Sequence, residues 1–245
     1  MNLSSYGSIQ EPLVENVHDA VDGSFKAAVF GFSDGLTTSI NLVLGVAFLG
    51  QSPNVVVLVG LTGLLAGASS MACGEWLSAY AEKEVQQQEL KTEKTHLECI
   101  ADEEARHMKG ILMNCGLSAA TADAVNRDVQ ALPIEQQVAF HAKFELGIDP
   151  EDLTQSPLKN AMFMWIYFTV GALVPIAPWL VIKDVQFAIG TSIALSVLAL
   201  VGISLYQVRG RHHLFCWTFM RQTGVLALSV GCTVGLNLAL QAYVY

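Results

Sequence analysis

The sequence has few charged residues, and those few are unevenly distributed. Only 14% of the 245 residues are Asp, Glu, Lys or Arg, whereas 52% are hydrophobic. This composition is too apolar for the surface of an ordinary soluble domain, so it indicates a membrane protein. Most of the charged side chains lie up to Lys26 or between Glu75 and Lys159. The charge therefore belongs to one aqueous module.

The sequence also lacks paired cysteines and a cleavable signal. Its five cysteines form no CxxC pair and show no spacing typical of a disulfide framework or a zinc site. We expect most of them to be buried, reduced thiols. The first 25 residues lack a positively charged start followed by an apolar stretch, which excludes a signal peptide. Residues 1–25 are predicted to be a disordered cytosolic tail.

Long apolar runs are present, and they predict an all-α integral membrane protein. A spanning helix needs about 20 mainly apolar residues. Five runs meet this requirement, at residues 27–49, 55 to about 80, 161–182, 185–208 and 223–245. Transmembrane helices 1 and 2 therefore occupy residues 26–80, and helices 3 to 5 occupy residues 159–245.

Residues 81–158 are polar and amphipathic, which predicts a helical module between the second and third spans. Gly116-Leu117-Ser118 resembles a helix stop followed by an N-cap, and Pro133 marks a second break, so about three helices are expected. Lysine and arginine concentrate on the cytosolic side of membrane proteins. This rule places the N-terminus and the module in the cytosol, leaves only Lys183 outside, and puts Tyr245 in the lumen.

A carboxylate in the first span, Asp34, indicates an ion or proton path. Insertion of such a group costs about 2.5–3.5 kcal/mol, although Asp34 would also be tolerated if it lies near enough to the cytosolic face to reach water. At about 1.5 Å per residue, Asp34 and Met71 lie at similar depths of roughly 10 and 13 Å. A carboxylate with a thioether suits Fe(II)-like ions better than Mg(II) or Ca(II), whereas Met71 alone would indicate packing. Glu75, one turn nearer the cytosol, would extend the path.

Gly31 and Gly35 form a GxxxG motif around Asp34. Small residues at this spacing let transmembrane helices approach closely. The motif predicts that the first span packs against its copy in a homodimer.

The module carries two E-x-x-H pairs, Glu93 with His96 and Glu104 with His107. Each pair lies on one helical face, as in four-helix di-iron carboxylate proteins. On one continuous helix, both pairs and Glu89 would form a single stripe, and His141 with Glu145 could close the site. An acidic, solvated helix face is the alternative. Imidazole and carboxylate together bind Fe(II), Mn(II), Co(II) or Zn(II) in competition with protons.

The sequence resembles the vacuolar iron transporter family, which includes the nodulin-21-like proteins, at residues 32–38, 67–78, 144–150 and 171–178. The resemblance implies a homodimer of five spans that exchanges cytosolic Fe(II) for protons through a cytosolic three-helix metal-binding domain. It implies Asp34 and Met71 as the path, and Glu93, Glu104 and Glu145 as capture residues. The chain departs from the plant members by carrying histidine at positions 96, 107 and 141, which implies a nitrogen-rich capture site.

Together these features predict a proton-coupled antiporter, not an enzyme, that exports Fe(II), and also Mn(II), into a vacuole-like compartment. Its partners would be metal ions, protons, the lipid bilayer and a second copy, with no nucleic acid and no permanently bound cofactor. The alternatives are a membrane-anchored di-iron oxidase and a metal sensor. The predicted location is a vacuolar or other endomembrane, with a bacterial inner membrane as the alternative.

Overall fold

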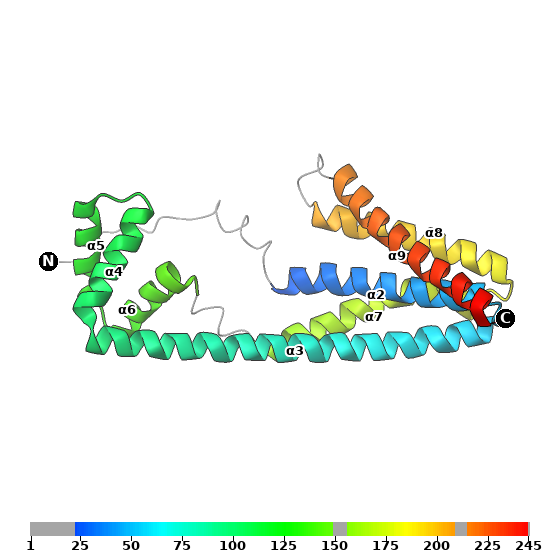
Figure 1. Ribbon diagram of the computed structural model, residues 1–245, viewed down its shortest axis with the longest axis horizontal. Coiled ribbons are helices and arrows are strands. Elements are labelled where there is room, and N and C mark those ends of the chain that lie inside the picture. The colour runs from blue at the N-terminus through cyan, green and yellow to red at the C-terminus, as the bar shows by residue number, and fades with distance from the viewer. Residues whose placement is uncertain (1–22, 149–155, 209–214, 245) are drawn as a thin grey trace, which may run out of the picture. The chain divides into compact units, whose positions relative to one another are not determined.

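The computed structural model describes residues 23–148, 156–208 and 215–244. Over these residues the chain forms helices joined by turns and contains no strand, which confirms the all-α prediction (Figure 1). Two compact units are present. The first contains the described residues up to Glu75 and from Asn160 onward, and the second is Trp76–Lys159.

Five helices of the described chain are long and apolar enough to cross a membrane, which confirms the five predicted spans. They are α2 (Gly23–Phe48), α3 (Pro53–Cys99), α7 (Pro157–Val181), α8 (Val185–Gln207) and α9 (Phe215–Val244). Pro53 occupies the first position of α3, where a missing N–H costs least. The Asp184 side chain caps α8 by accepting a hydrogen bond of 2.8 Å from the Phe187 N–H.

The first unit has a continuous hydrophobic core. Leu36 and Ile40 of α2 are at most 2% exposed, as are Phe168, Ile176 and Trp179 of α7. Helices α2, α8 and α9 also pack on one another. The buried faces of α2 and α7 form most of this core, whereas α9 keeps most of its apolar surface exposed.

Two glycines of α2 allow a close approach to α7 within the same chain. A Cβ at Gly31 would lie 3.0 Å from the Met164 sulfur of α7, and a Cβ at Gly35 would collide with the Phe168 carbonyl. Gly171 of α7 makes the reciprocal close approach to the Phe32 carbonyl. Gly31 and Gly35 thus lie against α7 of the same chain, and the packing of the first span against a second copy stays a prediction.

Helix α3 is much longer than predicted. We expected the second span to end near Tyr80, but the helix continues to Cys99 and contains 47 residues. At about 1.5 Å per residue it is about 70 Å long, whereas a bilayer core is about 30 Å thick. The helix continues because residues 75–99 contain no glycine or proline and are rich in Glu, Gln and Lys.

The second unit adds three short helices to the end of α3. They are α4 (Ala101–Asn114), α5 (Ala119–Gln130) and α6 (Ile134–His141), and α6 continues into a π-helical turn, η2 (Ala142–Leu146). The predicted stops are confirmed. Gly116 adopts φ 96°, the Ser118 hydroxyl accepts a hydrogen bond from the Thr121 N–H, and Pro133 directly precedes α6. Met108 and Leu112 of α4 form a small core with Ala122 of α5.

All five cysteines are free, and all are exposed. The expectation that most are buried is therefore wrong, because none of them lies in the cores of the two units.

Candidate metal centre

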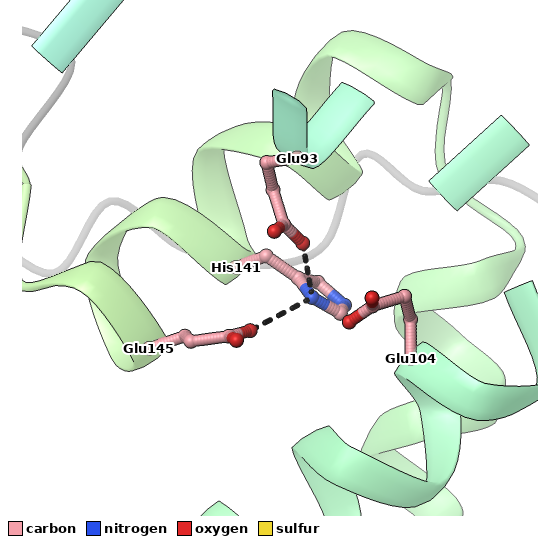
Figure 2. Close-up of side chains that lie close together, drawn as sticks. All are labelled: Glu93, Glu104, His141 and Glu145. Carbon is pink, nitrogen blue, oxygen red and sulfur yellow. Dashed lines mark ion pairs between the residues drawn. The ribbon is translucent and has the colours of Figure 1, made fainter. Parts of the chain in front are cut away.

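Four side chains of the second unit converge on one point (Figure 2). Glu93 comes from the end of α3, Glu104 from the first turn of α4, His141 from the end of α6 and Glu145 from η2. One ligand atom from each residue can be chosen so that all four lie within 4.8 Å of one another. Three carboxylates and one imidazole therefore surround a space of the size that a single cation needs.

A break at Ile100 brings the first two of these residues together. Ile100 has φ −133° and ψ 37°, which end α3, and its carbonyl accepts hydrogen bonds from the N–H groups of Glu103 and Glu104 at 2.9 and 3.2 Å. The chain thus turns at this point, and the two E-x-x-H pairs lie on two different helices. The prediction of a single stripe on one continuous helix is wrong, although Glu93 and Glu104 still meet.

The π-helical turn carries the fourth member of the cluster. Gly147 ends η2 with φ 67°, and the Ile148 N–H closes the wide turn with a hydrogen bond of 2.9 Å to the Ala142 carbonyl. The Glu145 side chain is 18% exposed, so it lies at the edge of the buried cluster. Single π-turns are frequent at functional sites because they change the direction of the side chains that follow.

Each of three histidines lies beside a carboxylate of the cluster. His141 Nδ1 is 2.9 Å from Glu93 Oε1 and 3.7 Å from Glu145 Oε2. His96 Nδ1 lies 3.2 Å from Glu104 Oε1, and His107 Nδ1 lies 3.1 Å from Glu145 Oε1. The His141 side chain is 4% exposed, but those of His96 and His107 are 46% and 59% exposed. His141 is therefore internal, and the other two form a rim.

The cluster holds several buried polar atoms that lack hydrogen bonds within the described part of the chain. They are one oxygen each of Glu93, Glu104 and Glu145, and Nδ1 of His141. The close approach of Glu93 to His141 has an ion-pair distance but not hydrogen-bond geometry. A buried polar atom without a partner costs about 1–3 kcal/mol. A cation coordinated by these atoms would remove that cost.

The electrostatics of the cluster also favour a cation. Burial raises the pKa of Glu93, and the nearby charge of Glu104 raises it further. Burial likewise raises the pKa of Glu145, with a contribution from Glu93, and burial lowers the pKa of His141. The neutral imidazole keeps a lone pair for a metal, and the carboxylates repel one another until a positive charge enters. This ligand set suits Fe(II), Mn(II), Co(II) or Zn(II).

The remaining predicted site residues lie elsewhere. Glu89 is exposed and lies outside the cluster. In the first unit, Asp34 is half-buried and accepts a long hydrogen bond of 3.5 Å from the Thr38 hydroxyl. Met71 packs against the hydrophobic core, and Glu75 is half-buried. Their function as a path therefore stays a prediction.

Sequence reasoning missed two supporting residues. Lys94 Nζ lies 2.6 Å from Glu135 Oε1, so an ion pair ties the end of α3 to the start of α6, next to the metal cluster. Thr38 was also missed, although a threonine four residues after an aspartate faces the same side of a helix. No comparable pattern marks Lys94, because its partner lies 41 residues away.

Comparison with known proteins gives a consistent result. The sequence model of the VIT family matches residues 25–237. A vacuolar iron transporter 1 of Tulipa gesneriana is 31% identical over 198 residues, which cover 81% of this chain and 78% of the relative. A vacuolar iron transporter 1 of Oryza sativa is 30% identical, with 72% and 69% covered. A vacuolar iron transporter of Toxoplasma gondii is 28% identical, with 96% and 80% covered.

Proposed function

This chain belongs to the VIT family, and from that premise we propose that it transports ferrous iron from the cytosol into a vacuole-like compartment in exchange for protons. The names of its relatives support iron as the cargo and the vacuole as the destination. One structural observation carries the proposal for this chain: the cluster of Glu93, Glu104, His141 and Glu145 with its unsatisfied buried atoms. Mn(II) would be accepted as well, because the same oxygen and nitrogen ligands suit it.

The cluster would act as the capture site. The rim histidines, His96 and His107, lie beside Glu104 and Glu145 and would be the first groups to meet a hydrated ion. Coordination by Glu93 and Glu145 requires that both be deprotonated, so each ion that binds releases protons. Release of the ion would return protons to these carboxylates.

Passage through the membrane would use Asp34, Met71 and Glu75 of the first unit. Asp34 is a carboxylate within a helix that is apolar enough to span the bilayer, and such groups serve mainly as ion or proton sites. We propose a cytosolic N-terminus and a lumenal C-terminus, because this orientation keeps most lysines and arginines in the cytosol. We also propose a homodimer, whose interface must use a face other than the one that Gly31 and Gly35 present to α7.

The test is metal flux in proteoliposomes with an imposed pH gradient. Fe(II) under reducing conditions, Mn(II) and Zn(II) would be compared for the wild type, Asp34→Asn and Asp34→Ala. We expect flux that needs the gradient and disappears in both variants, while metal binding by the capture site is retained. Full flux in Asp34→Ala would refute the path. If the folded wild type moves no ion but consumes oxygen with Fe(II), the protein is an oxidase and not a transporter.

A further inference from the structure

A second feature, far from the metal cluster in the sequence, is a cavity of about 490 Å³ in the first unit. It lies between the first turns of α2, the last turns of α8 and the first turns of α9. Its walls are mostly apolar, with Phe30, Leu200 and Val225 among them. Phe30 is 53% and Val225 is 61% exposed, so the cavity opens onto the outer surface of helices that span the membrane.

Among the residues that the structure describes, one positive charge lines this cavity. Arg221 of α9 is exposed, and within the described residues no carboxylate lies within 4.0 Å of its guanidinium group. Its neighbour Gln222 is already engaged, because the Gln222 side-chain oxygen accepts a hydrogen bond of 2.8 Å from Ser204. A charged side chain within a spanning helix is costly unless it reaches water, a headgroup or an anion. Arg221 is therefore available to an anionic partner from outside the described chain.

The position of Arg221 indicates what this partner is. Arg221 lies six residues after Phe215, the first residue of α9, which is about 9 Å along the helix. From this depth the long arginine side chain can extend along the helix to the headgroups at the end of the span. A guanidinium group pairs well with phosphate, since it can donate two parallel hydrogen bonds. Below the phosphate, the apolar wall of the cavity would contact hydrocarbon.

We propose that this cavity binds one anionic phospholipid, with its phosphate at Arg221 and an acyl chain along Phe30, Leu200 and Val225. The volume lies within the range of ordinary ligand cavities. In the proposed orientation this end of the unit faces the cytosolic leaflet, where anionic lipids are enriched. The bound lipid pairs with the charge of Arg221 and fills the space between α2, α8 and α9. This site does not depend on transport.

The experiment measures lipid binding by the full chain. Protein purified in mild detergent and stripped of lipid would be titrated with phosphatidylserine or phosphatidylcholine, and bound lipid would be counted by native mass spectrometry. The variants are Arg221→Gln, which removes the charge, and Val225→Trp, which fills the cavity. Lys183→Gln is the matched control, because it removes one positive charge at the opposite end of α8.

We expect the wild type to bind phosphatidylserine about five- to tenfold more tightly than phosphatidylcholine, which is the effect of about one favourable cation. Arg221→Gln should lose this preference, Lys183→Gln should keep it, and Val225→Trp should bind both lipids more weakly. An unchanged preference in Arg221→Gln overturns the proposal. Displacement of phosphatidylserine by millimolar inorganic phosphate would also overturn it, because the cavity would then be a simple anion site. Lipid binding that appears only when dimers dissociate would overturn it as well, because a second copy would then cover the cavity.

Discussion

Replacement of Glu93 by glutamine should stabilise the metal-free protein, because it removes one of three clustered carboxylates. The ligand atoms of the cluster lie within 4.8 Å of one another. Two unit charges at this separation repel by about 3 kcal/mol at an effective dielectric constant of about 20. Proton uptake already relieves part of this repulsion, since the pKa of Glu93 is raised. We therefore expect Glu93→Gln to raise the free energy of unfolding by about 1–2 kcal/mol, or roughly 2–8 °C in unfolding temperature.

The same substitution should abolish stabilisation by metal. For the wild type, Mn(II) at 100 times its dissociation constant adds about 2.7 kcal/mol to the free energy of unfolding. Loss of a direct ligand should weaken Mn(II) binding by about 100-fold or more. Even the mutation of a residue that only supports a ligand typically lowers metal affinity by about 10–100-fold. At the same Mn(II) concentration the variant would then gain about 0.4 kcal/mol or less.

The assay is thermal unfolding of the detergent-solubilised full chain at pH 7.5, with and without Mn(II). Glu89→Gln is the matched control, because Glu89 is an exposed glutamate one turn earlier on α3. It should change neither the metal-free stability nor the response to Mn(II). The reasoning fails if Glu93→Gln destabilises the metal-free protein, or if its response to Mn(II) equals that of the wild type.

Three further predictions concern the cluster and the helix packing. On acidification, metal affinity should begin to fall above about pH 4.3, the ordinary pKa of Glu. Metal binds only the deprotonated forms of Glu93 and Glu145, and burial raises the pKa values of both. Calorimetric titration with Mn(II) at several pH values measures this, and a midpoint at the ordinary pKa would contradict it. His141→Ala should weaken the binding of Zn(II) and Co(II) more than that of Mn(II), because imidazole favours Zn(II) and Co(II). Equal losses of affinity for the three ions in competition titrations would argue against His141 as a ligand. Gly35→Ala should lower the yield of folded protein, since its Cβ meets a backbone carbonyl, whereas Gly110→Ala on the open surface of α4 should be neutral or stabilising; size-exclusion profiles distinguish the two.

The parts of the fold that could be predicted are those that depend on local signals. Apolar length marks all five spans, and Gly116, Ser118 and Pro133 mark the ends of the module helices. The break at Ile100 could not be predicted in this way, because no glycine or proline stands there. A weaker signal was available, since three consecutive acidic residues, 102–104, suit the first turn of a new helix.

The candidate site was predicted by residue type but not by arrangement. Glu93 and Glu104 belong to the predicted E-x-x-H pairs, but they come close together only because the chain turns at Ile100. The approach of His141 to Glu93 depends on contacts between segments more than 40 residues apart in sequence. The contact of Gly31 and Gly35 with α7 was missed for a similar reason. A GxxxG motif shows that another backbone approaches closely, but not whether it belongs to the same chain.

The glycine contact between α2 and α7 also has a consequence for biogenesis. Gly35 and Phe168 are separated by 133 positions, and at roughly 5–20 residues per second a ribosome needs roughly 7–27 s to synthesise that interval. During this time α2 is in the membrane without the helix that fills its glycine face, while the complete second unit emerges and can fold. Until α7 arrives, lipid or another protein must cover this face, and slow synthesis of the module would prolong that interval.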